Sequence, residues 1–378
     1  MKHRKKRIVH ISTVHNALDP RVRLKQLRSI AETEMKAYFV TGDYTAKDEG
    51  DGVTVRRITK CRRKRLWRMA VLAPKAVWIA LLTPASVYHI HDPELLPWAW
   101  MLLFRNVPIF YDVHEDYSLA MQKKFYLPPW SRRVIGVMVG ILEKAFSLPY
   151  RYIIAEYSYT RRFPRAVPIL NYPQLSMLEN GSSFSTVQKT KNAQLLYTGY
   201  VTVERGALNL ARLVLNSSNM EITLAGRCFR NVARRIRKTA NKEAGRLHIV
   251  GEGRYVPFQE ILSYYRKRIW TAGIVLIPNL THFKEKHLTK FFEFMAFGLP
   301  IIASDFPAWR RFICGQGIGL CVDPENPEAV KEAIEWIRNN PSEAGKMGLR
   351  GSELIRRNYN WESQAKSLIA LYRSCIVK

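Results

Sequence analysis

Short apolar runs rich in β-branched and aromatic residues alternate with longer segments of helical periodicity along most of the chain. In the first half, the runs expected to form strands are 7–13, 37–40, 87–90, 109–111, 152–155 and 168–171. In the second half they are 195–198, 221–224, 247–250, 273–278 and 301–303. Helical patterns include 21–31 and, near the end of the chain, 360–375. Strands that alternate with helices predict βαβ units and parallel sheets.

The alternation is interrupted between residues 174 and 192. This stretch, QLSMLENGSSFSTVQKTKN, is polar and has no periodicity, which is typical of a linker. At roughly 150 residues per domain, a chain of 378 residues is expected to hold two domains. We therefore predict an α/β protein with two doubly wound domains, 1–173 and 193–358, and a ligand in the cleft between the carboxyl ends of their strands.

The charge of the chain points to an anionic partner. Sixty Lys and Arg against 31 Asp and Glu give a formal net charge of +29. A phosphate-bearing substrate, a nucleic acid and an anionic membrane surface all fit such an excess. The balance of 47% hydrophobic and 24% charged residues excludes wholesale disorder, collagen and a multi-span membrane protein.

Cysteine usage and the chain start indicate the compartment. The five cysteines are scattered and contain no C-x-x-C pair, which argues against a disulfide framework or a zinc site. The start, MKHRKKRIVHIST, has too few apolar residues for a signal peptide. No apolar run reaches the roughly 18 residues of a membrane span. We expect a cytoplasmic protein that does not cross a membrane.

The most informative stretch is 285–305, EKHLTKFFEFMAFGLPIIASD, in which aromatic residues surround one carboxylate, Glu293. A carboxylate inside so apolar a helix is costly unless something binds it. The bland alternative is that Glu293 pairs with Lys290 at the helix surface. Glu285 lies eight residues earlier, before the helix, and the helix start at Thr289 offers unpaired N–H groups to an anion. These neighbours favour a ligand-binding role.

The pattern E-x7-E followed by F-M-A-F-G-L-P-I-I-A-S resembles the hallmark of retaining glycosyltransferases with the GT-B fold, specifically family 4. The resemblance implies two Rossmann-like domains, an interdomain cleft and a C-terminal crossover helix, here 359–378, that packs back on the N-terminal domain. In that family the second Glu holds the nucleotide ribose and the first contacts the donor sugar. Those roles fall on Glu293 and, as a catalytic residue, Glu285. The family's Pro-Phe-Gly after the first Glu is replaced by Lys286-His287-Leu288.

A second match opens the C-terminal domain at 195–206, LLYTGYVTVERG. In the family a strand ends in Gly-Arg, a Lys follows five residues later, and both cations bind the donor diphosphate. Gly199 matches the Gly and Arg205 the Lys, but Tyr200 stands where the Arg would be. Fixed cations must meet the charge that grows on a diphosphate leaving group, so Lys290 or Arg227 is expected to substitute.

Arg205 also has a bland alternative, a solvated residue at a helix start that pairs with Glu204. The donor-binding residues that the resemblance implies are Gly199, Arg205, Thr289, Lys290 and Glu293.

In the N-terminal domain two polar clusters follow strands, HIHDPE at 89–94 and YDVHED at 111–116. Loops at strand carboxyl ends are where α/β domains keep their chemistry. The family's D-x-H-E segment supplies a His that reaches the donor sugar near the anomeric centre, and His114 matches it. His91 and Asp92 are expected to face the cleft or the acceptor. A metal site is the alternative for these residue types, although no compact ligand spacing appears.

The first strand–helix loop, VHNALDPRV, contains His15, Asp19 and Arg21. It resembles the family's H…D-x-R opening, which faces the interdomain cleft, so Asp19 and Arg21 are candidate acceptor or cleft residues. Asp19 is equally interpreted as an N-cap for the helix that follows.

Other catalytic signatures are absent from the sequence. The Gly-rich stretches 251–253 and 315–319 do not open the first βα unit of a domain, so we interpret both as turns. No Walker-type G-K-S/T or G-x-S-x-G motif occurs, which argues against a kinase, an esterase and an oxidoreductase.

Basic residues cluster with aromatics in the N-terminal half. Cations beside interfacial aromatics and an apolar helix face describe a surface that lies on an anionic bilayer, each cation contributing about 1 kcal/mol. A solvated helix face and a nucleic-acid patch are the alternatives, but no nucleic-acid module is present. The residues expected to face the membrane are Arg62, Arg63, Lys64, Arg65, Trp67, Lys123, Lys124 and Trp130.

The resemblance implies a retaining glycosyltransferase that moves a hexose-type sugar from a nucleotide-diphosphate donor, without metal or other cofactor. The leaving diphosphate would help to deprotonate the acceptor on the same face. The expected acceptor is a glycan or lipid-linked glycan at the inner membrane face, as in capsule, exopolysaccharide or lipopolysaccharide assembly, with the enzyme peripheral on that membrane and no nucleic acid bound. The alternative function is a non-catalytic protein of the same scaffold that binds nucleic acid or an anionic polymer.

Overall fold

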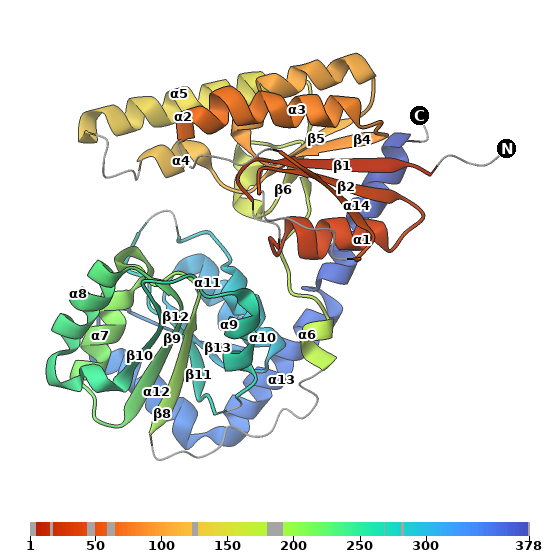
Figure 1. The fold of residues 1–378 in the computed structure, drawn as a ribbon. Coiled ribbons are helices and arrows are strands. Elements are labelled where there is room, and N and C mark those ends of the chain that lie inside the picture. The colour runs from red at the N-terminus through yellow and green to blue at the C-terminus, as the bar shows by residue number, and fades with distance from the viewer. Residues whose placement is uncertain are drawn as a thin grey trace. The chain divides into compact units, whose positions relative to one another are not determined.

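The structure, a computed structural model, describes residues 5–15, 18–43, 50–58, 65–122, 128–179, 192–267, 269–280 and 283–376. The chain forms two compact units (Figure 1). Unit 1 comprises residues 1–171 together with 361–378, and unit 2 comprises residues 172–360. Within the described residues, no helix combines the length and apolar character that are needed to span a bilayer.

Unit 1 is built on a seven-stranded sheet of order β3-β2-β1-β4-β5-β6-β7. Each pairing between neighbouring strands is parallel. The strands are β1 (Arg7–Ser12), β2 (Lys36–Thr41), β3 (Val53–Arg57), β4 (Val87–Ile90), β5 (Ile109–Val113), β6 (Arg151–Ile154) and β7 (Val167–Pro168). The chain runs outward from β1 to β3 and then returns to β4 on the other side of β1, so the order reverses between β1 and β4.

Helices cover both faces of this sheet. Successive strand residues point to opposite sides, so apolar side chains lie on both faces and each face needs a covering layer. On one face Val9 packs with α3 and η4, and on the other Ile8 packs with Trp361 and Tyr372 of the last helix. The helices of unit 1 are η1 (Val22–Leu27), α1 (Arg28–Ala31), α2 (Arg65–Trp67), η2 (Arg68–Leu72), α3 (Ala73–Leu82), η3 (Pro93–Leu95), η4 (Trp98–Arg105), α4 (Tyr117–Gln122), α5 (Pro129–Ser147), η5 (Tyr157–Arg161) and α14 (Trp361–Ile376).

Unit 2 contains a six-stranded sheet of order β10-β9-β8-β11-β12-β13. Its neighbouring strands are again paired in parallel. The strands are β8 (Ala193–Thr198), β9 (Met220–Cys228), β10 (Leu247–Glu252), β11 (Ala272–Val275), β12 (Ile301–Ser304) and β13 (Gly319–Val322). Here the order reverses between β8 and β11, which makes their carboxyl ends the expected ligand position.

The helices of unit 2 cover both faces of its sheet (Figure 1). A core of strand residues with α7, α8 and α12 lies on one side, where Leu195, Leu210, Ile236 and Ile334 are buried together. The helices are α6 (Ser176–Glu179), η6 (Val203–Arg205), α7 (Ala207–Leu215), α8 (Arg230–Ala240), η7 (Asn241–Arg246), α9 (Phe258–Tyr265), α10 (Thr289–Ala296), α11 (Pro307–Ile313), α12 (Pro327–Asn339) and α13 (Pro341–Arg357).

The predicted α/β fold with two parallel sheets is confirmed, with differences in detail. The sequence prediction omitted β3 and β13, which lie at the edges of their sheets. Gly251 and Glu252, interpreted as part of a turn, are the end of β10, and Gly319 begins β13. These glycines fit strands because the neighbouring backbone is close: a Cβ at Gly319 would lie 2.0 Å from the carbonyl oxygen of Ile301.

Candidate active site

In unit 1 the polar residues singled out from the sequence gather at the carboxyl ends of β1, β4 and β5. Arg21 and Asp112 form a buried ion pair there, with Nη2 to Oδ1 at 2.8 Å and Nε to Oδ2 at 3.1 Å. Gln26 donates a further hydrogen bond of 2.7 Å to Asp112 Oδ2. Burial opposes ionisation of Asp112 most strongly, but the charges of Arg21 and His114 hold its pKa well below the usual range. Asp112 is therefore a fixed buried anion.

Asp19 both caps the first turn and binds a histidine. Its Oδ1 accepts the backbone N–H groups of Arg21 and Val22 at 2.9 Å each. Its Oδ2 lies 2.8 Å from Nδ1 of His15. Burial works against a charged His15, yet the hydrogen bond to Asp19 and the charges of Asp92 and Asp19 raise the pKa of His15 to about 9. The structure thus supports the capping interpretation of Asp19 and adds a charged partner.

Asp92 organises the loop after β1 and is itself buried. Its Oδ2 accepts hydrogen bonds from Ser12 Oγ at 2.8 Å and from the backbone N–H of Thr13 at 2.6 Å. Glu94, two residues on, accepts from both nitrogens of Arg68, at 3.0 and 3.1 Å. Through these hydrogen bonds Asp92 stabilises the loop that contains His15.

His114 and His91 lie side by side, with His114 Nε2 at 3.1 Å from His91 Nδ1. Two further histidines, His10 in β1 and His89 in β4, are fully buried behind them. Burial is the main cause that lowers the pKa of His10, His89 and His91. The sequence analysis did not single out His10 or His89 individually. A histidine within an apolar strand indicates a buried polar group and could have identified them.

Two overlapping groups in this cluster have ligand atoms close enough to hold a metal ion: His10, His89 and His91, and His91, Asp112 and His114. In the second group, however, the guanidinium of Arg21 already binds the carboxylate of Asp112. All ring nitrogens of His91 and His10 have a hydrogen-bond partner as they stand. Hydrogen bonds therefore already occupy these nitrogens, whereas Nε2 of His89 has no hydrogen-bond partner among the described residues.

In unit 2 the candidate residues gather at the carboxyl end of β8, where the strand order reverses. Gly199 directly follows β8 with a φ of +88°. Gly206 has a φ of +86°, and a Cβ there would lie 1.8 Å from the carbonyl oxygen of Leu276, just after β11. Only glycine allows this approach. It fixes the turn that carries Arg205 against the end of the neighbouring strand.

Glu293 on α10 is held by a tyrosine that the sequence reasoning missed. Tyr265 of α9 donates a hydrogen bond of 2.8 Å to Glu293 Oε2. The same hydroxyl lies 2.8 Å from Thr198 Oγ1 at the end of β8. The alternative of Glu293 pairing with Lys290 is not observed, because the Lys290 ammonium group has no hydrogen-bond partner among the described residues.

Lys290 is buried and its Nζ lies 3.5 Å from the centroid of the Tyr197 ring. A Cβ on Gly199 would lie 3.9 Å from that Nζ, so the amine is directed at the end of β8. Burial and the nearby charge of Arg205 lower the pKa of Lys290 well below its ordinary value, and Glu293 opposes this in part. Burying an amine without a hydrogen-bond acceptor costs free energy, and an anionic ligand would provide that acceptor.

The remaining candidates of unit 2 lie nearer the surface. Glu285 is exposed in the turn before α10, and Thr289 is the exposed first residue of that helix. Tyr200 is 47% exposed. Arg227 is exposed in β9, and its guanidinium carbon lies 4.7 Å from the centroid of the Phe229 ring. Of the two cations considered as substitutes at Tyr200, only Lys290 is directed at Gly199.

Most of the residues expected to face a membrane lie outside the described residues, namely Arg62, Arg63, Lys64, Lys123 and Lys124. Arg65 begins α2. Trp67 is partly buried against the unit 1 core, whereas Trp130 is 79% exposed at the start of α5.

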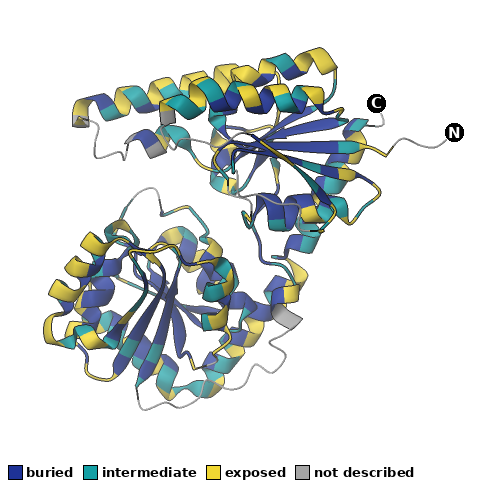
Figure 2. Cartoon of the chain, in the orientation of Figure 1, coloured by how far each residue is buried: buried dark blue, intermediate teal, exposed yellow. Residues whose placement is uncertain are grey.

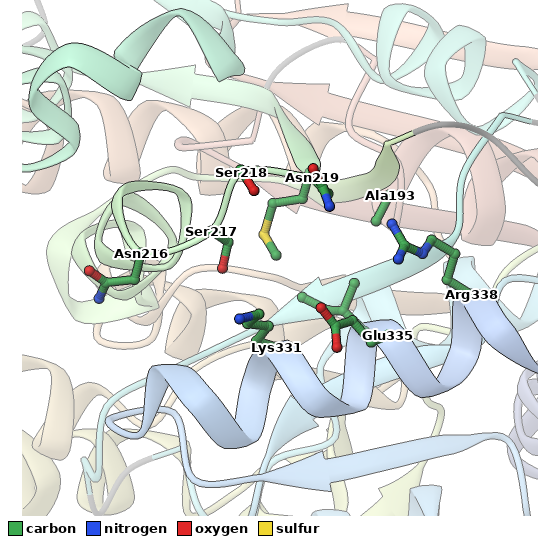
Figure 3. Close-up of a pocket in the computed structure, with 10 residues that line it drawn as sticks. Ala193, Asn216, Ser217, Ser218, Asn219, Lys331, Glu335 and Arg338 are labelled. Carbon is green, nitrogen blue, oxygen red and sulfur yellow. The ribbon is translucent and has the colours of Figure 1, made fainter.

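A pocket in unit 2 lies apart from the site (Figure 3). It is lined by Ala193 and Met220, which begin β8 and β9, and by Lys331 and Arg338 of α12. It therefore opens at the amino ends of these strands, whereas Gly199, Lys290 and Glu293 gather at the carboxyl end of β8.

Comparison with known proteins finds a family match within unit 2. Residues 209–353 match the family model described as glycosyl transferases group 1. Phosphatidyl-myo-inositol mannosyltransferase of Mycobacterium leprae is 23% identical over 296 residues, 76% of this chain and 73% of that protein. D-inositol 3-phosphate glycosyltransferase of Corynebacterium urealyticum is 27% identical over 118 residues, 31% of this chain and 26% of that protein.

Solved structures share the fold over nearly the whole chain. Sucrose-phosphate synthase from Thermosynechococcus elongatus gives a TM-score of 0.73 at 17% identity, covering 98% of this chain and 99% of that one. HepE from Anabaena, in complex with UDP and glucose, gives a TM-score of 0.68 at 9% identity, covering 98% of this chain and 100% of that one.

Proposed function

We propose that this chain, a glycosyltransferase with the GT-B fold, is of the family 4 type and transfers a hexose from a nucleotide-diphosphate sugar with retention of configuration. The acceptor is a glycan or lipid-linked glycan in cell-surface polysaccharide assembly. Two relatives support this chemistry by their names: one is a mannosyltransferase acting on phosphatidyl-myo-inositol, and HepE was solved with UDP and glucose.

The observation that carries the proposal is the buried amine of Lys290 at the end of β8, which has no hydrogen-bond partner in the described part of the chain. In this proposal a donor diphosphate accepts hydrogen bonds from Lys290 and Arg205, and Glu293 holds the ribose hydroxyls. A dianion beside Lys290 favours its charged form, so binding would reverse the lowered pKa. Lys290 thereby supplies the second cation that Tyr200 does not.

The transfer step needs charge stabilisation on both sides of the breaking bond. The bond between the anomeric carbon and the diphosphate oxygen breaks, and the acceptor oxygen forms a bond to the same face of that carbon. The acceptor proton passes to the departing diphosphate. Lys290 and Arg205 stabilise the diphosphate, and His114 contacts the donor sugar near the anomeric centre.

The test measures release of nucleotide diphosphate from a panel of UDP-, GDP- and ADP-sugars, with and without a membrane-derived glycolipid extract. Thermal shifts with the free nucleoside diphosphates identify the base first. We expect one sugar nucleotide to turn over, and Glu293→Gln to lose most of that turnover while the fold is kept. Glu325→Gln, in an exposed loop, is the matched control. If no sugar nucleotide turns over and the protein retains only anionic polymers, the non-catalytic alternative replaces this proposal.

The acceptor side of the proposal includes an anionic membrane surface. Helices α3, η4 and α5 lie next to one another, since Trp100 Nε1 donates to the Phe146 carbonyl at 2.8 Å and Arg105 donates to that of Leu81. Exposed residues follow the outer side of these helices (Figure 2). The large exposed apolar side chains there include Trp78, Leu82, Trp100, Phe104, Trp130, Val134, Val137, Met138 and Ile141.

The charge of this helical layer suits a bilayer of anionic lipid. The exposed charged residues of α3, η4 and α5 include Lys75, Arg105, Arg133 and Lys144. The one carboxylate in these helices, Glu143, is buried and bound to Tyr111 and Arg162. An apolar stripe flanked by cations alone favours binding in the interface of anionic lipids.

Vesicle flotation tests this surface. We expect the protein to float with phosphatidylglycerol vesicles, to be released by salt, and to bind neutral phosphatidylcholine weakly. Ile141→Asp should lower the bound fraction about tenfold, because it places a charge in the apolar stripe. Leu349→Asp on α13, where the leucine is 45% exposed, is the control and should leave binding unchanged. Equal binding by both variants would refute the assignment of the surface.

A further inference from the structure

A continuous hydrogen-bonded chain links the C-terminal helix to His114. Tyr372 of α14 contacts Nε2 of His10 at 3.2 Å through its hydroxyl. Nδ1 of His10 lies 2.9 Å from Nε2 of His91. Nδ1 of His91 in turn lies 3.1 Å from Nε2 of His114. These side chains belong to one unit and, apart from His114, are buried, so water does not compete for the contacts.

The chain also runs from Tyr372 in the other direction and ends at a carboxylate. The Tyr372 hydroxyl lies against Nδ1 of His89. The other nitrogen of that ring, Nε2, lies 3.6 Å from Asp112 Oδ2. His114 Nε2 lies 3.4 Å from the same oxygen. The tyrosine therefore joins two arms of histidines that both end beside Asp112.

A neutral imidazole has one N–H and one lone pair, so each ring passes on the direction of the hydrogen bond that it receives. With all four rings neutral, only two directions are consistent with the contacts. In the first, each of the four rings carries its proton on Nε2, and His89 and His114 both present an N–H to Asp112. In the second, each carries it on Nδ1, and the lone pairs of His89 and His114 face the anion.

Asp112 selects the first direction. Its carboxylate is a fixed anion with a pKa well below the ordinary range, because the charge of Arg21 and the hydrogen bonds from His114 and His89 outweigh the effect of burial. An N–H group directed at an anion is favourable, whereas a buried lone pair in the same place is repelled. The first direction places the N–H groups of His89 and His114 beside Asp112. The second places only that of His91 there, whose Nδ1 lies 3.7 Å from Asp112 Oδ2.

We propose that Tyr372 is a positioning residue for His114: through His10 and His91 it fixes the proton of His114 on Nε2 and leaves Nδ1 as a hydrogen-bond acceptor. His114 then receives a hydrogen bond from a hydroxyl of the sugar rather than donating one. The assignment of that hydroxyl to the donor sugar rests on the proposed function, but the tautomer itself does not.

Tyr372→Phe removes only the hydroxyl that joins the two arms. His10 Nε2 then has no acceptor and His89 Nδ1 has no donor, so the direction of the chain is no longer set from that end. Tyr111→Phe is the matched control, because Tyr111 is equally buried in unit 1 but donates its hydroxyl to Glu143 at 2.7 Å, outside the chain.

The measurement is the ¹⁵N–¹H correlation spectrum of the histidine rings of the full chain, which distinguishes protonated from bare ring nitrogens. We expect His10, His89, His91 and His114 to carry their protons on Nε2 in the wild type and in Tyr111→Phe. In Tyr372→Phe we expect the Nδ1–H form of His114 to appear and kcat/KM for transfer to fall about tenfold, as for one lost buried hydrogen bond.

Two results would overturn the proposal. One is a wild-type spectrum with the His114 proton on Nδ1, as a metal ion on Nε2 would also produce; metal analysis of the purified protein separates these causes. The other is an unchanged set of ring spectra in Tyr372→Phe. Because the spectra need no substrate, a lack of glycosyl transfer would refute the proposed function while leaving the tautomer result to stand or fall on its own.

Discussion

Tyr265 donates a hydrogen bond of 2.8 Å to the carboxylate of Glu293, and its own oxygen lies 2.8 Å from the hydroxyl of Thr198. An ionised carboxylate only accepts, so the tyrosine must donate to Glu293 and accept from Thr198. A strand end and two helices are thereby joined by one buried hydroxyl. Burial and the charge of Glu293 raise the pKa of Tyr265 well above its usual value, which keeps the hydroxyl protonated.

Removal of this hydroxyl is expected to weaken nucleotide binding. Tyr265→Phe leaves one oxygen of Glu293 without the donor that orients it, so the carboxylate meets the ribose in several orientations. We expect the Kd of the cognate nucleoside diphosphate to rise about tenfold, the value for a hydrogen bond to a charged group. Isothermal titration calorimetry measures the change. Tyr264→Phe, on the same helix, should leave the Kd as it is, and an equal effect of both variants would contradict the role of Tyr265.

Gly206 is the glycine on which the unit 2 site depends most. An alanine Cβ there would lie 1.8 Å from the Leu276 carbonyl oxygen, at a φ of +86°. Because neither backbone can withdraw without disturbing β11, we expect Gly206→Ala to cost about 3 kcal/mol or more of folding free energy. Urea unfolding of unit 2 measures it. Gly245→Ala, where no atom lies within 4 Å of the added carbon, should change stability by less than about 1 kcal/mol.

Sequence reasoning located the Glu293 helix because its signal is local. One carboxylate among phenylalanines, followed by Gly and Pro, defines a helix, its end and a buried strand within about twenty residues. The strand-ending Gly199 was visible for the same reason. Edge strand β3 was missed because only its first residue is buried and it ends in two exposed arginines. Edge strand β13 was missed because it starts with glycine, which lowers β-propensity.

The partners of the site residues could not be predicted, because tertiary packing alone brings them together. Tyr372 lies 283 residues from His89, and nothing in the pattern of α14 distinguishes it from an ordinary core aromatic. Tyr265 is equally ordinary in its own helix. Lys290 was considered as a partner of Glu293 because the two are close in sequence. The structure instead directs its amine at the Tyr197 ring, since the helix face it shares with Phe291 and Phe294 is buried.

The histidines of unit 1 predict an asymmetric dependence of stability on pH. A buried histidine with a lowered pKa stays neutral when folded but takes up a proton when unfolded. Its contribution is therefore present above the unfolded pKa of about 6.5 and lost as the pH falls below it. For His10 and His91 together, both lowered well below the ordinary value, acidification to pH 5 should cost up to about 4 kcal/mol.

At alkaline pH the free energy of unfolding is expected to fall as the pH rises. His15, with its pKa raised to about 9, contributes stability that is present below pH 6.5 and lost as the pH rises through 9. Urea unfolding from pH 5 to 9, followed by hydrogen exchange of peptides from β1 and β4, reports unit 1 separately. His10→Asn should make the acid limb shallower, whereas His248→Asn, at an exposed histidine, should not. A flat profile between pH 5 and 7 would show that these histidines are not held neutral.

Lys290→Met separates a role in ligand binding from a role in folding, because nucleotide affinity should fall while the free energy of unfolding rises. The methionine fills a similar volume and removes a buried amine that has no acceptor, so we expect the free energy of unfolding to rise by about 1–3 kcal/mol. Nucleoside diphosphate affinity should fall about 30-fold, or about 2 kcal/mol, since a desolvated cation facing the diphosphate is lost. Lys331→Met, at a partly exposed lysine of α12, should change neither quantity. A variant that is less stable and binds nucleotide normally would mean that Lys290 serves the core of unit 2 and not a ligand.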